Sequence, residues 1–572
     1  MVCSSLRFLF LMGVMVAVSS GCTDAKELDP TEDTETLGDD DHPEDDGVDL
    51  SEALFAPDHL IEVNVEIDPP DWAILRQEGR SVPGVFTGCQ RDYEYTYFRA
   101  RVTVDGEAYN DVAIRKKGFL GSLSALRPSL KLNFGKYVDG RTHADMKRMT
   151  LNNNHSDPTN ANQCMTYALF TKAGAVAPRC NFAHVVVNGT DLGIYTHLES
   201  IKKPMLRRHF DDDSGNLYEG QGADFIDTRL DLMELKTNEE ENDRSDLDAV
   251  TAALELDNAE LLDALEPLVD IDAFLTFWAM EVLTGHWDSY SGGRNNYLTY
   301  HDPTSDRFVF IPWGTDDAFS QTRVFSGDNR YVGTLAEGRI ANRLYGHPAG
   351  RAMYFERITQ LFEQVWDEAE LLTELDRIAA LTNAPAAVVE AKRNFISSQT
   401  EAMRTALSTT DTAPDWISQE LSEISCVPER ATPVSGRFTV QWGSPAPLDT
   451  PPEIDLTIAG DPWQPSLFVG GAGLASDAPD GAQIIIGSPG ADGRFHALVV
   501  RLPAQHLTEG THVMHGLETG VIMVTIDLGD SSDLRVVGFA GDGSITLDEA
   551  SMEPGGNVSG EFEAQFVQIT PL

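Results

Sequence analysis

Apolar and polar residues alternate with a period of two from about residue 60 onward. The alternation is clear at residues 61–67 and at residues 97–104, which Asp105-Gly106 follows. Alternation that ends in Asp-Gly predicts β-strands joined by a hairpin. The same pattern predicts further strands at residues 130–134, 184–189 and 193–195, with a helix between them at residues 160–174. This part of the chain is expected to form an α+β lobe.

Helical periodicity replaces the alternation from Ser245, which is placed as a helix N-cap. One apolar helix face is predicted from the spacing of Ile271, Phe274, Leu275, Trp278 and Val282. Two strands are then predicted at residues 297–300 and 308–313, and helix returns at residues 351–407. After Cys426 the chain becomes rich in Gly, Pro, Thr and Val, with short alternating segments. A small all-β, sandwich-like accessory domain is predicted at residues 432–572.

The N-terminus has the features of an export signal. Arg7 precedes an apolar run at residues 8–18, which is too short to span a bilayer but suits the core of a signal peptide. Small residues precede Cys22 as in a bacterial lipobox, although Ser19 stands where Leu is usual. Residues 1–22 are therefore predicted to be a lipoprotein signal, with a lipid anchor at Cys22 as the only membrane attachment. A plainly cleaved secretory protein is the alternative.

Charge divides the exported chain into a tether and a body. Residues 23–52 contain fourteen Asp and Glu against one Lys, which is −13 of the formal net charge of −49. Such a block of like charge is expected to remain a solvated, disordered tether. The body is also strongly acidic, which argues against nucleic acid as a partner because phosphate backbones are held by clustered Lys and Arg.

Cysteine usage agrees with export. Apart from Cys3 in the signal and Cys22, the chain has four cysteines, Cys89, Cys164, Cys180 and Cys426. Four cysteines in an oxidising compartment allow three pairings, and the sequence leaves the choice open. They occur singly, without a Cys-x-x-Cys pair, which argues against a zinc site.

Five cations lie between residues 115 and 131 of this acidic chain, among them Arg115, Lys117 and Lys131. Glycines and hydroxyl residues accompany them, and a local positive spot of this kind suits an anionic phosphate. The alternative is a basic edge strand whose charges only prevent pairing with another strand.

A carboxylate, a pair of asparagines and a second carboxylate further along the chain occur in the order that phosphoryl transfer needs. Asp288 follows a predicted helix, Asn295 and Asn296 precede a strand, and Asp316 follows the next strand. One carboxylate can accept a hydroxyl proton, while an Asn oxygen and the second carboxylate hold Mg²⁺ against the phosphates. In the alternative interpretation, Asp288 and Asp316 are ordinary turn residues.

Taken in order, these motifs resemble the spore coat protein H (CotH) kinase family over about residues 60–405. The resemblance is carried by Arg115-x-Lys117-Gly118, Pro128-Ser129-Leu130-Lys131-Leu132-x-Phe134, Leu151-Asn152-Asn153-Asn154 with Asp157-Pro158, Ala177-Pro178-Arg179, Val187-Asn188-Gly189-x-x-x-Gly193-Ile194-Tyr195-x-x-x-Glu199, Asp288, Asn295-Asn296-Tyr297 and Ile311-Pro312-Trp313-x-x-Asp316. It implies an atypical protein-kinase-like, two-lobed domain at residues 53–425. It also implies transfer of the γ-phosphate of ATP, with Mg²⁺, to Ser or Thr of a secreted or surface protein.

The resemblance also implies roles for single residues. Asp288 and Lys131 are expected to be catalytic, with Lys131 on the phosphates and Glu199 orienting it. Arg115 and Lys117 are expected to reach the phosphates as well. The implied metal ligands are Asp316, Asn295 and Asn296.

Two departures from the family pattern bear on activity. Gly314 stands where the family usually has the first Asp of Pro-Trp-Asp-x-Asp, and Asp317 is the candidate to compensate. An Arg common in the helix after Asp-Pro is also absent, and Gln163-Cys164 occupy that area. Two hypotheses therefore stay open, an exported kinase and a catalytically weak surface lipoprotein that serves as an adhesion or matrix-binding module.

Overall fold

The computed structural model describes residues 49–89, 93–320, 331–419, 426–443, 445–448, 450–458, 460–465, 467–475, 481–490, 492–529 and 534–569. The predicted signal, its lipidated Cys22 and residues 23–48 of the predicted tether lie outside the described residues. The predicted end of the tether at residue 52 is wrong, because Asp49 already caps the 3-10 helix η1 (Leu50–Phe55). Asp49 also pairs with Arg179 at 2.8 Å.

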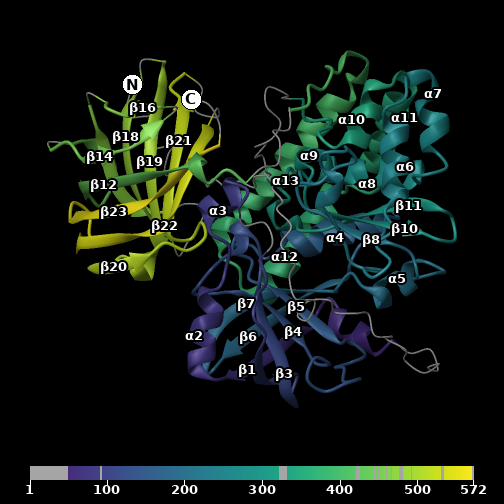
Figure 1. The fold of residues 1–572 in the computed structure, drawn as a ribbon, viewed down its shortest axis with the longest axis horizontal. Helices are drawn as coiled ribbons and strands as arrows, with labels where there is room; N and C mark the ends of the chain where they lie inside the picture. Colours follow the sequence, from purple (N-terminus) through teal and green to yellow (C-terminus); the bar gives the residue numbers. More distant parts are fainter. Residues whose placement is uncertain are drawn as a thin grey trace.

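A closed seven-stranded barrel forms the N-terminal part of the fold, in the order β1-β2-β3-β4-β5-β7-β6 (Figure 1). Its strands are β1 (Leu60–Ile67), β2 (Phe98–Val104), β3 (Glu107–Lys117), β4 (Ser129–Asn133), β5 (Arg148–Asn152), β6 (Cys180–Val187) and β7 (Thr190–Leu198). The predicted alternation places Ile61, Val63 and Val65 in the barrel interior, where each is almost fully buried. The strand and hairpin predictions for this region are confirmed.

Closure of the barrel decides between the two interpretations of the basic cluster. The parallel pairing of β1 with β6 completes the ring. Both basic strands therefore have a hydrogen-bonded neighbour on each side, since β3 pairs with β2 and β4, and β4 pairs with β3 and β5. The edge-strand interpretation is wrong, because a closed barrel has no edge to protect.

Helices and a small sheet make up the second part of the chain. The sheet has the order β11-β10-β8-β9. Its strands are β8 (Leu217–Gly220), β9 (Met233–Leu235), β10 (Tyr297–Asp302) and β11 (Arg307–Pro312). The helices around it and beside the barrel are α2 (Pro69–Gln77), α3 (Val82–Phe86), α4 (Asn162–Lys172), α5 (Lys203–His209), α6 (Ser245–Leu254), α7 (Asn258–Leu265), α8 (Ile271–Leu283), α9 (Tyr290–Gly293), α10 (Arg339–Gly346), α11 (Pro348–Gln364), α12 (Glu368–Thr382) and α13 (Ala386–Leu407).

Two details of the helix prediction need correction. Ser245 is the first residue of α6 rather than its N-cap, and its backbone N–H donates to Asp243 Oδ1 at 3.0 Å. Helix α8 is buried around most of its circumference rather than along one face, because α11 and the small sheet pack against it. Trp278 lies at the centre of this core and stacks on Tyr354 with ring centroids 3.8 Å apart.

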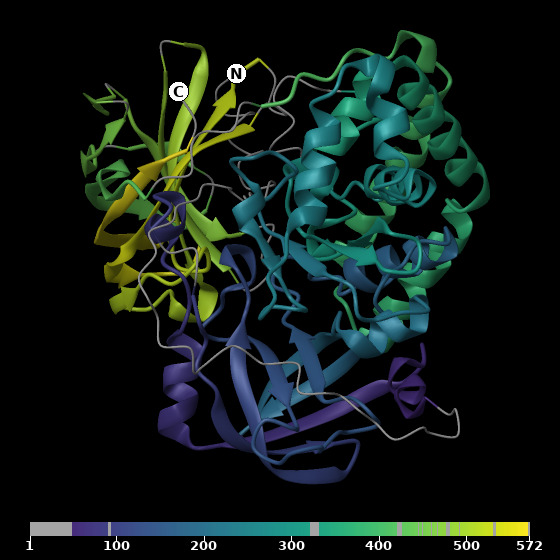
Figure 2. The ribbon, with the colours of Figure 1, turned by 45° about the vertical axis from the view of Figure 1, so that its right-hand side comes forward.

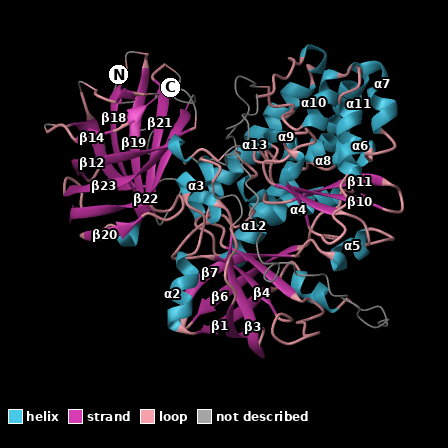
Figure 3. Ribbon diagram, in the orientation of Figure 1, coloured by secondary structure: helices cyan, strands magenta, loops and turns pink. Residues whose placement is uncertain are grey.

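The C-terminal part is one continuous antiparallel sheet of ten strands, coloured magenta at the left of Figure 3. Its strands are β12 (Ala431–Gln441), β13 (Ala446–Pro447), β14 (Glu453–Asp455), β17 (Val469–Leu474), β18 (Gly481–Pro489), β19 (Arg494–Pro503), β20 (Gly510–Val513), β21 (Gly520–Asp527), β22 (Leu534–Ala550) and β23 (Asn557–Gln568), beside the small pair β15 (Thr457–Ile458) and β16 (Asp461–Pro462). The sheet curls until Trp442 bridges Ala472, and it encloses a core of its own. A single curled sheet thus replaces the predicted sandwich of two sheets.

Two disulfides settle the pairing that the sequence left open. Cys164 bonds to Cys180 and joins α4 to the barrel. Cys89 bonds to Cys426 across 337 positions of sequence and joins the segment after α3 to the start of the C-terminal domain. Within the described part of the chain, no helix combines the length and the apolar character that crossing a membrane requires.

Candidate active site

Asp288 lies in the short connection between α8 and α9 and is almost fully buried. Its carboxylate accepts hydrogen bonds from Asn295 Nδ2 at 3.1 Å and from Asn296 Nδ2 at 2.7 Å. Arg294 and Asn296 both have positive φ, which turns the chain back toward Asp288 before β10 begins. Burial and the nearby Asp316 carboxylate raise the pKa of Asp288 to about 8, against the opposing effect of the two amides. The structure therefore brings together three of the predicted site residues.

Buried charged groups hold this loop in place from behind. Glu281 of α8 accepts hydrogen bonds from the backbone N–H groups of Tyr290 at 3.2 Å and Ser291 at 3.0 Å. Arg294 pairs with Asp224 at 3.1 Å and with Glu337 at 3.1 Å. Since all of these groups are buried and mutually satisfied, they fix the backbone that carries Asp288.

The second acidic position is η4 (Thr315–Asp317), directly after β11. Ser156 Oγ donates to Asp316 Oδ2 at 3.1 Å, and Asn162 Nδ2 donates to the Asp316 carbonyl at 2.6 Å. Burial raises the pKa of Asp316, and burial together with the Asp316 and Asp288 carboxylates raises the pKa of Asp317 well above its ordinary value. The predicted ligand Asp316 and the proposed substitute Asp317 thus lie in one acidic site with Asp288.

Gly314 has a physical reason to be glycine. Its φ is +53°, and a Cβ added there would lie 2.4 Å from Asn296 Oδ1. The Asn296 side chain occupies the space into which an Asp at position 314 would project. The departure from the family motif is therefore coupled to the position of Asn296.

Lys117, one of the predicted cations, lies in the electrostatic field of the acidic site. It leaves the end of β3, donates to Asn152 Oδ1 and lies with its Nζ 6.0 Å from the centroid of the Trp313 ring. Burial lowers the pKa of Lys117 to about 8, while the Asp316 carboxylate acts in the opposite direction. Because Trp313 and Asp316 follow β11, Lys117 connects the barrel to the helical part at the site.

Arg115, on the same strand as Lys117, is paired with Lys131 of the neighbouring strand β4. Arg115 lies over the Tyr97 ring with its Cζ 5.2 Å from the centroid. Although burial raises the pKa of Glu219, the Lys236 ammonium holds it below its ordinary value, and Lys131 contributes to this lowering. Lys131 is thus within electrostatic reach of β8 in the helical part.

Glu199 lies between two arginine side chains in the structure. Both of its carboxylate oxygens accept hydrogen bonds from Arg208, and Arg179 Nη2 donates to Oε1 at 2.9 Å. Burial raises the pKa of Glu199, but the Arg208 and Arg179 guanidinium groups offset this and hold it low. The structure gives Glu199 two arginine partners where a lysine was predicted.

The predicted metal ligands differ in how their side chains are used. Asn295 Oδ1 accepts a hydrogen bond from the Gly222 N–H at 3.2 Å, so its amide is engaged at both ends. Asn296 directs Oδ1 toward Gly314, at the start of the segment that carries Asp316 and Asp317. Among the described residues, no group of three or more His, Cys, Asp or Glu side chains forms a ready-made metal site.

This donor set nevertheless fits Mg²⁺. The available atoms are carboxylate and amide oxygens, and the buried carboxylates of Asp288, Asp316 and Asp317 repel one another. Mg²⁺ usually binds through one or two carboxylates together with substrate phosphates, rather than in an all-protein cage. The residues present suit an ion that binds together with a nucleotide.

Several residues of the site escaped prediction. Asn152 was noted only as part of a motif, yet it holds Lys117, and its Nδ2 donates to Gln163 Oε1 at 2.7 Å. Lys392 of α13 donates to the Phe319 carbonyl at 3.3 Å and lowers the pKa of Asp317 against the effect of burial. The run of three asparagines was a usable signal for Asn152. Lys392 gives no signal in the sequence, because it lies 75 residues beyond Asp317 in an ordinary amphipathic helix.

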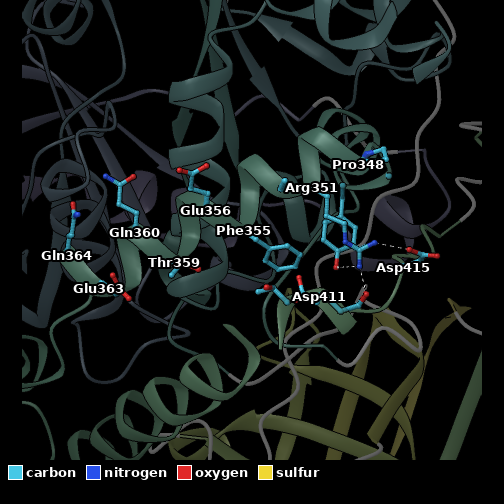
Figure 4. Close-up of a pocket in the computed structure, with 15 residues that line it drawn as sticks. Pro348, Arg351, Phe355, Glu356, Thr359, Gln360, Glu363, Gln364, Asp411 and Asp415 are labelled. Carbon is cyan, nitrogen blue, oxygen red and sulfur yellow. Dashed lines mark hydrogen bonds and ion pairs between the residues drawn. The ribbon is translucent and has the colours of Figure 1, made fainter. Parts of the chain in front are cut away.

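A separate groove of about 950 Å³ lies on the helical part, between α10, α11 and the segment at residues 410–415 (Figure 4). Figure 4 shows Arg351 in the groove beside Asp415, with which it pairs at 2.8 Å. The lining includes none of the described candidate residues. The groove is therefore distinct from the site around Asp288.

Comparison with known proteins decides the family. The family model described as CotH kinase protein matches residues 114–421, which is more than half of the chain and includes every residue of the site around Asp288. The chain belongs to the CotH kinase family.

Curated relatives from two organisms support this assignment. Inner spore coat protein H of Bacillus subtilis is 26% identical over 191 residues, which cover 32% of this chain and 52% of that protein. Invasin CotH7 of Rhizopus delemar is 23% identical over 256 residues, covering 41% of this chain and 42% of the relative. Invasin CotH2 of the same fungus is 22% identical over 321 residues, covering 49% and 53%. The chain spans about half the length of these CotH relatives.

Proposed function

We propose that this CotH family member is an exported kinase that transfers the γ-phosphate of ATP to a Ser or Thr hydroxyl of a secreted or surface protein, with Mg²⁺. The observation that carries the proposal is the convergence of Asp288 with the Asp316–Asp317 pair, close to the barrel cation Lys117. Phosphoryl transfer needs positioned charges more than covalent chemistry, and this arrangement supplies them. The barrel takes the place of the nucleotide-binding lobe of a kinase, and the helical part takes that of the catalytic lobe.

In this mechanism Asp288 orients the substrate hydroxyl and accepts its proton while the hydroxyl oxygen bonds to the γ-phosphorus and the bond to the β-phosphate oxygen breaks. Asn295 and Asn296 hold the Asp288 carboxylate in position. Lys117 binds phosphate oxygens, and positive charge is added by Arg115 on the same strand and by Lys131 on the neighbouring strand β4. Asp316, Asp317 and the Asn296 oxygen would hold Mg²⁺, which supplies neutralisation of the triphosphate charge when bound.

Export rests on separate support. Two disulfides are formed, and such bonds persist in oxidising compartments outside the cytoplasm. The relatives are named as an inner spore coat protein and as invasins, and these names support the proposed export. We extend the proposal to lipid anchoring at Cys22. Cys22→Ser is expected to release the protein from membranes in a fractionation experiment, whereas retention of this variant in the membrane fraction would contradict the anchor.

The kinase proposal is tested with the purified chain, labelled ATP and Mg²⁺. Asp288→Asn is expected to lower phosphate transfer by about 10²–10⁴-fold, the usual contribution of a general base, and to leave ATP binding intact. Asp316→Asn is expected to weaken Mg²⁺-dependent ATP binding itself. The matched control is Asp306→Asn, in the turn between β10 and β11, where the side chain is 90% exposed. A wild-type chain that binds no ATP in the presence of Mg²⁺, or an Asp288→Asn variant of full activity, would refute the proposal.

A second function is favoured by the names of the fungal relatives. Two of them are called invasins, so a surface protein that binds a host or matrix component is the alternative for this chain. Binding of cells that display the chain to a panel of matrix proteins tests it. Binding that survives both Asp288→Asn and Asp316→Asn, in a chain that does not transfer phosphate, supports adhesion over catalysis.

A further inference from the structure

The C-terminal sheet is fastened to the rest of the chain by an apolar contact around α3. Figures 1 and 2 both place this helix against the sheet. Phe86 of α3 stacks on Phe539 of β22 with ring centroids 4.9 Å apart, within one buried cluster that includes residues of both parts. The Cys89–Cys426 disulfide closes the same region covalently. Apolar packing and a covalent link together indicate a fixed attachment.

One turn of the C-terminal domain, residues 515–518 between β20 and β21, contacts the loop at residues 118–128 that connects β3 to β4. Ser124 Oγ donates to Glu518 Oε1 at 2.6 Å, and the Ala125 N–H donates to Glu518 Oε2 at 3.0 Å. Gly516 has φ +55°, and a Cβ there would lie 2.8 Å from Leu123 Cβ. Both the charge and the missing side chain of this turn fit the surface of the loop.

The same turn completes the environment of Lys116. Lys116 is fully buried, and its Nζ donates to the Arg76 carbonyl at 2.7 Å and lies 2.8 Å from His515 Nε2. Since Lys116 directly precedes Lys117, the domain contact reaches the backbone next to the candidate phosphate-binding lysine. The end of β3 that carries Lys116 and Lys117 is therefore contacted by residues of the C-terminal domain that lie far away in sequence.

On its inner side the loop is tied to the candidate active site. Asn153 Nδ2 donates to the Ser122 carbonyl at 3.0 Å and to the Arg127 carbonyl at 2.7 Å. The neighbouring Asn152 holds Lys117. A connected set of hydrogen bonds thus runs from Glu518 through the loop to Asn153, beside the Asn152–Lys117 pair.

We propose that Glu518 is a positioning residue for the nucleotide site, so that the C-terminal domain is a required part of the phosphate-binding unit and not an independent accessory module. By capping Ser124 and Ala125, Glu518 holds the loop in the conformation that places Lys117 and Lys131 together. The effect of Glu518 on ATP binding rests on the proposed kinase function. The ordering of the loop by Glu518 does not depend on that function. Each can therefore be tested by its own measurement.

The test compares Glu518→Ala and Glu518→Gln with the wild-type chain. The matched control is Glu553→Ala, which removes an exposed carboxylate from a turn elsewhere in the same domain. Amide hydrogen exchange is measured for residues 119–127, and the affinity for ATP with Mg²⁺ is measured by titration. Glu518→Ala removes both hydrogen bonds that Glu518 accepts from the loop. It is expected to speed exchange in the loop and to raise the Kd for ATP roughly tenfold. Glu518→Gln keeps an acceptor for Ser124 and is expected to be intermediate.

The outcomes separate the two claims. Transfer at saturating ATP is expected to change less than about twofold, since Glu518 touches no reacting atom and its loss acts on binding. Loop exchange in Glu518→Ala equal to that in Glu553→Ala would overturn the inference, and so would faster exchange with unchanged ATP affinity. If the wild-type chain binds no ATP, the kinase function fails, and the exchange comparison still decides whether Glu518 orders the loop. An intact Cys89–Cys426 disulfide on a non-reducing gel and an unchanged circular dichroism spectrum show that the variants are folded.

Discussion

Restoring the family carboxylate at position 314 is expected to damage the protein. Gly314 has φ +53°, and a new Cβ would lie 2.4 Å from Asn296 Oδ1, closer than real Cβ contacts allow. The Gly314→Asp variant must therefore displace Asn296 or shift its own backbone. Either movement disturbs Asp288, whose carboxylate and carbonyl accept hydrogen bonds from Asn296 Nδ2 at 2.7 Å and 2.9 Å.

The magnitude follows from two contributions. A residue other than glycine in the left-handed region costs about 1–2 kcal/mol. Loss of the Asn296 hydrogen bonds to Asp288 costs about 1–3 kcal/mol, depending on the charge of the carboxyl group. We expect Gly314→Asp to lower the free energy of unfolding by about 2–5 kcal/mol and to reduce phosphate transfer instead of increasing it.

Urea unfolding followed by tryptophan fluorescence measures this loss, and a double-mutant cycle assigns its cause. Gly314→Ala introduces the same backbone strain and the same Cβ without a charge. Asn296→Ala removes the group with which that Cβ collides. The double variant is expected to be more stable than the sum of the two single losses predicts, by about 1 kcal/mol or more, because the contact between the two residues is then absent.

A Gly314→Asp variant that is as stable as wild type within about 0.5 kcal/mol, the ordinary range for a harmless surface substitution, would refute this prediction. Additive losses in the cycle would also contradict it, since they would mean that Asn296 and position 314 do not interact. A gain in phosphate transfer would show that the missing carboxylate, and not the position of Asn296, limits activity.

Three further predictions concern the surroundings of the site. Arg294→Ala leaves the buried Asp224 carboxylate without its cation, so the free energy of unfolding is expected to fall by about 3–5 kcal/mol. A fall of less than about 1 kcal/mol in urea unfolding would contradict a buried ion pair. Because folding raises the pKa of Asp288 to about 8 from an ordinary value of 3.8, the metal-free chain is expected to lose stability as pH rises from 3.8 to about 8. Thermal unfolding at several pH values measures this slope, which Asp288→Asn should flatten, and an unchanged slope would contradict the assignment. Cys426→Ser removes the disulfide to Cys89 and is expected to lower the free energy of unfolding by about 2–5 kcal/mol. Equal urea midpoints for the variant and wild type under oxidising conditions would contradict a stabilising role of this disulfide.

Local patterns in the sequence were sufficient for several elements. The alternation at residues 61–67 and the Asp105-Gly106 turn predicted β1 and the β2–β3 hairpin, and both are confirmed. Helix α4 (Asn162–Lys172) lies inside the predicted range of 160–174. These successes share one physical cause, which is that side-chain period and turn chemistry act between residues close in sequence.

Local sequence patterns could not show which strands pair when the strands come from distant segments of the chain. The ring closes only because β1 pairs in parallel with β6, more than a hundred residues later, and no local signal distinguishes a closed barrel from an open sheet. The same limit explains the C-terminal domain, where one curled sheet and two facing sheets have the same alternation. Burial patterns record which face of a strand is apolar but not what covers it.

For the site, the sequence determined the identity and order of Asp288, Asn295, Asn296 and Asp316, because their positions after helices and strands are local features. Only the tertiary structure decided which partners the residues in and around the site meet. It engaged Glu199 with two arginines, set Lys117 in the electrostatic field of Asp316, and brought Glu518 onto a loop almost four hundred residues earlier. Charges and hydrogen bonds act over a few ångströms in space, whatever their separation along the chain, so only the folded chain fixes which of them meet.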